Sequence, residues 1–234
     1  MASCETSPGR IAVVAGASGL VGGHCLNALL ASPCYQRVIS VARHASATEH
    51  PKLVQQVVNF DRLAAFPPLE GADVFCALGT TIRKAGSQEA FRRVDYEYPL
   101  RLAGRAREAG ASRFVLVSSV GADEKSNNFY LRVKGELEKA IAGAGFSSVL
   151  ILRPSILLGS RVEFRLGERI GQAAARAGQC LLAGSWRRYR AVPASEVGCA
   201  MVEAAQSGAV GTHIYEWAEI HELASRTREC SGTT

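Results

Sequence analysis

Two side chains four residues apart, Tyr130 and Lys134, are well placed in this sequence for proton transfer. On a helix, residues at this spacing lie on one face, so the phenol and the ammonium can meet. Such a tyrosine can give a proton to a carbonyl oxygen while a hydride reaches the carbonyl carbon, and a neighbouring ammonium favours the phenolate that is left. The same lysine can also hold the ribose of a nucleotide. The pair therefore predicts proton donation by Tyr130, assisted by Lys134.

A pair of serines, Ser118 and Ser119, closes an apolar run shortly before this pair. In a doubly wound sheet, ligands bind at the carboxyl ends of the strands. A serine there can hydrogen-bond a substrate carbonyl and stabilise the negative charge that develops on its oxygen. Serines are also common where a strand passes into a loop. The catalytic interpretation therefore depends on the serine, the tyrosine and the lysine occurring together and in this order.

A glycine-rich turn lies between the apolar run Ile11 to Gly16 and an amphipathic segment that starts at about Leu20. A pyrophosphate needs a tight turn, a close approach of the backbone and a helix packed closely on the strand, and each need excludes a Cβ. The amino end of the helix then presents free N–H groups to the phosphates. We predict a dinucleotide site here. It is formed by Gly16, Ser18, Gly19, Leu20, Val21 and Gly22, with Ser18 adding a hydroxyl contact.

The choice of dinucleotide depends on the residue after the second strand. NAD-binding proteins place an acid there to bond the ribose 2′-hydroxyl, whereas this chain reads Ser-Val-Ala-Arg-His and supplies Arg43. A guanidinium can pair with the 2′-phosphate of NADP. The alternative is a solvated arginine, and we favour NADP(H). Asp61, after the third strand, can reach the adenine amino group or cap a helix.

The elements that position these residues alternate between strands and helices along the chain. Predicted strands are 11–16, a run from 37, 54–60, 72–78, 113–119 and 148–153, and predicted helices are 20–30, 98–108 and 130–143. Such alternation predicts right-handed βαβ crossovers. We expect an α/β fold, a doubly wound parallel β-sheet (Rossmann fold) with a small C-terminal substrate-side annex. Residues 1–234 form a single NAD(P)-binding domain in this prediction, and 156–190 form the annex.

Composition narrows the class of protein. The 27 basic and 21 acidic residues give a formal charge of +6, but the arginines are scattered, so we expect no nucleic-acid partner. The seven cysteines include no C-x-x-C pair, which argues against a disulfide framework or a metal site and favours a reducing compartment. The amino-terminal residues lack an apolar signal core, and the apolar runs are too short to cross a bilayer. We expect a cytoplasmic protein without a membrane partner.

These motifs together resemble the atypical branch of the short-chain dehydrogenase/reductase superfamily, in particular its HIV Tat-interactive protein-like NADP-binding oxidoreductases. The resemblance covers about residues 10–205 and includes GASGLVG at 16–22, ALGTT at 77–81, VLVSSVGAD at 115–123, SNNFYLRVKGELE at 126–138, LRPSILLG at 152–159 and VPASEV at 192–197. It implies a catalytic triad of Ser119, Tyr130 and Lys134, with Ser119 chosen as the second serine of the pair, and it supports Arg43 as the NADP-selecting residue. It also implies cofactor contacts from Leu78, Gly79, Thr80, Pro154, Ser155 and Ile156.

The sequence therefore leads to three hypotheses about function. The first is an NADPH-dependent oxidoreductase that reduces a small-molecule carbonyl substrate, as a monomer or homodimer. The second is an NADP(H)-binding regulatory or interaction protein with little turnover. The third is an isomerase or dehydratase that acts on a sugar nucleotide, against which the short annex argues. Arginines of the annex region can meet an anionic substrate, but a solvated face is the favoured interpretation. They are Arg161, Arg165, Arg169, Arg187, Arg188 and Arg190.

Overall fold

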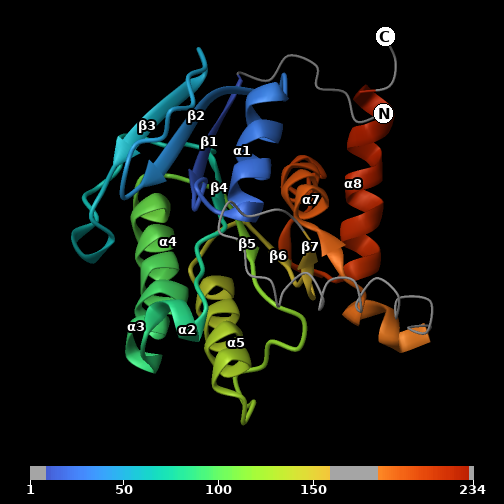
Figure 1. Ribbon diagram of the computed structural model, residues 1–234. Coiled ribbons are helices and arrows are strands. Elements are labelled where there is room, and N and C mark those ends of the chain that lie inside the picture. Colours follow the sequence, from blue (N-terminus) through green and yellow to red (C-terminus); the bar gives the residue numbers. More distant parts are fainter. Residues whose placement is uncertain (1–8, 159–183, 232–234) are drawn as a thin grey trace.

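A seven-stranded parallel sheet forms the centre of the molecule in the computed structural model, which describes residues 9–158 and 184–231 (Figure 1). The strand order is β3-β2-β1-β4-β5-β6-β9. The strands are β1 (Arg10–Ala15), β2 (Tyr35–Ala42), β3 (Leu53–Val57), β4 (Asp73–Cys76), β5 (Arg113–Val117), β6 (Ser148–Leu152) and β9 (Gly211–Tyr215). The chain runs outward from β1 to β3 and returns to β4 beside β1, so the sheet is doubly wound, as predicted, and its strand order reverses between β1 and β4.

Helices cover both faces of the sheet (Figure 1). One face carries α1 (Leu20–Ala31), α7 (Ala194–Gln206) and α8 (Trp217–Ser231), and the other carries α4 (Tyr98–Glu108) and α5 (Phe129–Ala142). Shorter elements connect them: η1 (Phe60–Arg62), α2 (Ile82–Ala85), α3 (Gln88–Arg92), the π-helical segment η2 (Arg93–Glu97) and η4 (Gly184–Tyr189). A separate two-stranded sheet pairs β7 (Leu157–Leu158) with β8 (Val192–Pro193).

The core follows from the two-fold periodicity of the strands. Successive side chains point to opposite faces, so Val14 packs with the cluster that includes Cys25 and Met201, while Val13 packs with Phe114 and its neighbours on the other face. Because helices bury both faces, the central strands contain continuous apolar runs rather than alternating ones. This is why the strands were recognisable in the sequence.

The predicted elements agree with the structure in the first two thirds of the chain and less well beyond. The helix 98–108 is confirmed, and Gly110 after it has a φ of 99°. The third strand ends early, at Val57, because Asn59 accepts a hydrogen bond from Asp61 N–H and begins η1. The edge strand β9 was not predicted, because its first four residues are exposed and form no continuous apolar run. Of the expected annex, residues 159–183 lie outside the described residues.

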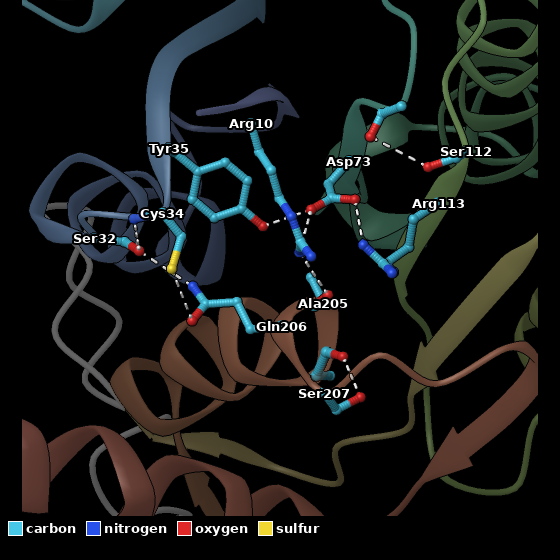
Figure 2. A network of polar contacts seen from close by, with 12 residues as sticks. Arg10, Ser32, Cys34, Tyr35, Asp73, Ser112, Arg113, Ala205, Gln206 and Ser207 are labelled. Carbon is cyan, nitrogen blue, oxygen red and sulfur yellow. Dashed lines mark hydrogen bonds and ion pairs between the residues drawn. The ribbon is translucent and has the colours of Figure 1, made fainter. Parts of the chain in front are cut away.

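A buried polar network joins the first residues of four strands, at the amino-terminal end of the sheet, opposite the glycine turn (Figure 2). The Asp73 side chain is fully buried, and it accepts hydrogen bonds from Tyr35 Oη at 2.7 Å and Arg113 Nη1 at 2.6 Å. Arg10 Nη1 lies 3.6 Å from the same carboxylate. These residues begin β4, β2, β5 and β1 respectively. The network therefore fixes one end of the sheet by charge and hydrogen bonding and leaves the carboxyl ends for a ligand.

Candidate functional site

The glycine turn lies where the sheet order reverses. Gly16 has a φ of +89°, and a Cβ on it would lie 2.5 Å from the carbonyl oxygen of Ala77, at the end of β4. A Cβ on Gly22 would overlap the carbonyl oxygen of Gly16 and lie 2.6 Å from its carbon. Gly19 N–H closes the turn on Gly16 O at 2.8 Å. Glycine at 16 and 22 is thus required by the close contact between β1, β4 and α1.

The amino end of α1 is suited to an anion. Its N-cap residue, Gly19, provides no side-chain cap, and the first turn of this helix contains no acidic residue. The N–H groups of Leu20, Val21 and Gly22 have no partner inside the helix, because the first turn of any helix leaves them free. Ser18 is exposed next to them. The residues predicted for the pyrophosphate therefore form one surface with N–H groups and a positive helix end.

The loop after β4 places the next predicted cofactor residues at the carboxyl-terminal end of the sheet, near the glycine turn. Leu78 and Thr80 are half-buried and Gly79 is exposed. A Cβ on Gly79 would lie 3.3 Å from Asp95 Oδ1 and 3.8 Å from Lys134 Nζ. This glycine therefore faces the same lysine that the sequence pairs with Tyr130.

Arg43 and Asp61 have different surroundings. Arg43 is exposed and directly follows β2, the strand parallel to β1 and next to it. It therefore lies at the carboxyl-terminal end of the sheet, as the glycine turn does. Asp61 lies in η1 and accepts a hydrogen bond from Tyr98 Oη at 3.1 Å, while Arg101 Nη1 lies 3.6 Å from it. The carboxylate of Asp61 is therefore bound to α4 in this structure, and its contact with adenine remains a prediction.

Helix α5 carries Tyr130 and Lys134 on one face, as the spacing predicts. The Asn128 side chain caps the helix by accepting from Leu131 N–H at 3.2 Å. The Tyr130 ring packs against the buried ring of Phe91, with 5.6 Å between centroids. Lys134 is only 4% exposed, and its Nζ lies 2.8 Å from Asp95 Oδ1. The helix thus holds a half-buried phenol beside a buried ammonium.

The electrostatics of Lys134 combine two opposing effects. Burial lowers the pKa of the ammonium, but the carboxylate of Asp95, followed by Tyr130, raises it, and the net direction is upward. A buried lysine without such a partner shifts the other way. The lysine is therefore held as a cation.

The loop after β5 carries the two serines and packs tightly on α5. Ser118 is buried and its N–H donates to Leu152 O at 2.8 Å, whereas Ser119 is half-buried. Asp123 N–H donates to Leu131 O at 3.2 Å, and a Cβ on Gly135 would lie 2.7 Å from Asp123 Cα. This close contact fixes the loop that begins with Ser119 on the helix that carries Tyr130.

The segment 154–156 lies next to the serine loop. Val120 N–H donates to Pro154 O at 3.0 Å, and Ser155 Oγ donates to Arg190 O. Pro154 is buried, whereas Ile156 is 53% exposed. The three predicted residues therefore lie at the carboxyl-terminal end of the sheet, beside the serine loop.

Two charged residues of this site were missed by sequence reasoning. Asp95 lies in η2 and pairs with Lys134, and Glu138, one turn after Lys134 on α5, pairs with Arg153 at the end of β6. The Arg153 Nε–H donates to Glu138 Oε1 at 3.0 Å. Glu138 lies in the motif at 126–138, but its partner is known only from the fold.

Comparison with known proteins identifies the family. Residues 16–169 match the family model described as NAD(P)H-binding. The chain is 38% identical over 194 residues to Protein HTATIP2 of Rattus norvegicus, covering 81% of this chain and 78% of the relative. It is an atypical short-chain dehydrogenase/reductase. The present chain is also 36% identical over 213 residues to Protein FMP52, mitochondrial, of Lodderomyces elongisporus, and the match covers 85% of this chain and 88% of that relative.

Solved structures support the fold at low sequence identity. Human epimerase family protein SDR39U1, solved with NADPH, matches at a TM-score of 0.62 and 18% identity, over 88% of this chain and 74% of that one. MoeE5, solved with UDP-glucose and NAD, matches at a TM-score of 0.63 and 19% identity, over 96% and 82% of the two chains. The NAD(P)-binding fold of this dehydrogenase/reductase family is therefore established, and the residues at its sheet edge fit a dinucleotide.

The expected cytoplasmic location is wrong. The FMP52 proteins of Emericella nidulans, Lodderomyces elongisporus and Candida albicans, to which the chain is similar, are named mitochondrial. The prediction rested on the polar amino-terminal residues and on cysteine usage, and neither feature separates one reducing compartment from another. Within residues 9–158 and 184–231, no helix combines the length and apolar character needed to span a membrane.

Proposed function

We propose that this protein is an NADPH-dependent oxidoreductase that reduces a small carbonyl compound. The observation that carries the proposal is the buried Lys134 ammonium, which faces Gly79 in the loop proposed to bind the cofactor and lies four residues from Tyr130 on the same helix. Perturbed, buried charges next to a binding edge are typical of catalytic sites. Here the charge lies between the residues proposed to bind the cofactor and the phenol proposed to act on the substrate.

The proposed chemistry assigns one task to each side chain. NADPH, when bound, supplies the hydride that reduces the carbonyl carbon. Tyr130 Oη donates its proton to the carbonyl oxygen, and the phenolate that remains is stabilised by the ammonium of Lys134. Ser119 donates a hydrogen bond to the same oxygen as negative charge develops there. Lys134 would also hold the ribose of the bound cofactor, and the products are the alcohol and the oxidised cofactor.

The preference for NADPH rests on Arg43 and on the lack of an acid after β2. We propose that Arg43 pairs with the 2′-phosphate. A thermal-shift comparison of NADPH, NADP, NADH and NAD tests this, because a ligand stabilises by RT ln(1 + [L]/Kd). We expect the larger shift with the phosphorylated pair and a loss of this difference in Arg43→Ala. An equal or larger shift with NADH would contradict the assignment.

The decisive variant is Tyr130→Phe. Phenylalanine keeps the ring that packs on Phe91 and removes only the proton donor, so folding is preserved. A general acid contributes about 10²- to 10⁴-fold to the rate, and we expect a loss of kcat in that range in NADPH oxidation with an active compound from a carbonyl panel. Tyr96→Phe, a half-buried tyrosine whose ring lies under Arg92, is the matched control and keeps wild-type kcat. An unchanged kcat in Tyr130→Phe would refute the mechanism.

The same panel separates the other hypotheses. Tight NADPH binding with no turnover of any carbonyl compound would favour a regulatory NADP(H)-binding protein. Conversion of UDP-glucose, which is bound in the MoeE5 structure, would favour an isomerase of sugar nucleotides.

We propose a mitochondrial location from the FMP52 relatives. Fractionation of cells that express the tagged full chain tests it, and recovery of the protein outside the mitochondrial fraction would contradict it.

A further inference from the structure

Asp95 and Lys134 form an ion pair that is almost completely removed from water. Their side chains are 1% and 5% exposed, and Asp95 Oδ1 lies 2.8 Å from Lys134 Nζ. Burying two opposite charges is costly, and an apolar pair of similar volume is often at least as stable. A contribution to stability alone therefore does not explain why an aspartate and a lysine are buried here, next to the predicted cofactor site.

The second carboxylate oxygen of Asp95 binds the loop after β4. Asp95 Oδ2 accepts a hydrogen bond from Thr80 N–H at 2.8 Å, and Thr80 belongs to the loop after β4. A Cβ on Gly79 would lie 3.3 Å from Asp95 Oδ1, so the loop also covers the carboxylate. One carboxylate therefore connects the lysine of α5 to the loop that lines the predicted cofactor site.

The backbone that carries Asp95 is itself unusual. It lies in the π-helical segment Arg93–Glu97, between α3 and α4. Each extra residue in a helix rotates the following side chains by about 100°, and single π-helical turns are frequent at functional sites. The segment thus allows α4 to pack on the sheet while Asp95 points toward Lys134.

We propose that Asp95 is a positioning residue for this site: its carboxylate keeps the Lys134 ammonium charged and fixed in position, and couples it to the loop after β4. The proposal rests on the proposed function in assigning Lys134 to the cofactor. Three titratable groups act on Lys134 in the described structure: Asp95 of η2, Tyr130 of α5 and Cys76 of β4. Asp95 exerts the largest charge effect of the three, so its loss leaves burial as the dominant effect on the lysine.

The first test reads the charge of Lys134 directly and needs no activity. The chain has five lysines, at 52, 84, 125, 134 and 139, so ¹³Cε-labelled lysine gives a simple spectrum, which Lys134→Met assigns. In the wild type, we expect the Lys134 signal to stay that of an ammonium up to about pH 10. In Asp95→Asn, we expect its titration midpoint to fall by at least about two pH units, because buried lysines without a partner can titrate near neutral pH. An unchanged midpoint would overturn the proposal.

Matched controls separate this effect from damage to the fold. Asparagine at 95 keeps an oxygen for Thr80 N–H. Asp73→Asn removes a fully buried carboxylate at the opposite end of the sheet, and we expect it to leave the Lys134 titration unchanged. A Lys134 midpoint that fell equally in Asp73→Asn would show general loosening and overturn the proposal.

The second test is a double-mutant cycle on NADPH affinity by calorimetry. We expect Asp95→Asn to weaken binding by about tenfold, which is about 1.4 kcal/mol, and to have less than a twofold effect in the Lys134→Met background, because it acts through the lysine. Additive losses would overturn the coupling. If the wild type itself fails to bind NADPH, the proposed function fails, while the lysine titration still decides whether Asp95 holds the charge.

Discussion

Replacing Gly22 by alanine adds one methyl group at the point where α1 crosses the turn after β1. The new Cβ would overlap the Gly16 carbonyl oxygen, lie 2.6 Å from the Gly16 carbonyl carbon and lie 3.0 Å from Ala17 N. Because carbon atoms in contact are about 3.5–4.0 Å apart, the helix and the turn must separate by about 1 Å. Neither side of this contact is a flexible side chain, so the backbone itself must move.

The free energies of this substitution oppose each other. Alanine is favoured over glycine inside a helix by about 1 kcal/mol, whereas overpacking of a tight site costs about 1–3 kcal/mol. With backbone on both sides, the upper value applies, so we expect a net loss of about 2 kcal/mol. For a chain of this size that lowers the melting temperature by about 4–8 °C. Displacing the turn by about 1 Å should also weaken NADPH binding at least tenfold, or about 1.4 kcal/mol.

Gly104 provides the matched control. It also lies inside a helix, α4, but a Cβ there would meet no atom within 4 Å. Gly104→Ala should therefore stabilise the fold by up to about 1 kcal/mol and leave NADPH affinity unchanged. Thermal unfolding and calorimetry measure both quantities. Wild-type stability and affinity in Gly22→Ala would refute the reasoning, since the turn would then have a different geometry.

Other predictions concern the strand-start network and the serine loop. Burial and the charge of Asp73 raise the pKa of Tyr35 well above 10, so the unfolded chain ionises first. The contribution of Tyr35 to stability is therefore full below pH 10 and falls above it by about 1.4 kcal/mol per pH unit. Tyr35→Phe should make the alkaline slope shallower by that amount in denaturant titrations, and an unchanged slope would contradict the assignment. Asp73→Asn should cost about 2–3 kcal/mol, less than the 3–5 kcal/mol of fully buried pairs, because Arg113 is 14% exposed; a loss under 1 kcal/mol in urea unfolding would be inconsistent with this network. Gly135→Ala should push the segment at Asp123 off α5 and reduce kcat more than NADPH affinity, and equal losses would argue against its role in fixing Ser119.

The architecture and many of the candidate residues are predictable from local patterns in the amino-acid sequence. Buried parallel strands are continuous apolar runs, so β1, β4, β5 and β6 were visible as such. The glycine turn was interpretable because three glycines stood between a strand and a helix, and Tyr130 and Lys134 because a helix places residues four apart on one face. These are local relations, and local chemistry is enough to specify them.

The contacts of those residues follow only from the folded arrangement of distant segments. The partner of Lys134 is Asp95, from a different helix and with no local signal, and that partner determines the charge of the lysine. In the same way, the sequence does not show which groups bind the Asp61 carboxylate, whereas in the fold it contacts Tyr98 and Arg101. Charges interact through space rather than along the chain. The order of residues therefore specifies which charged groups are available, and packing specifies which of them meet.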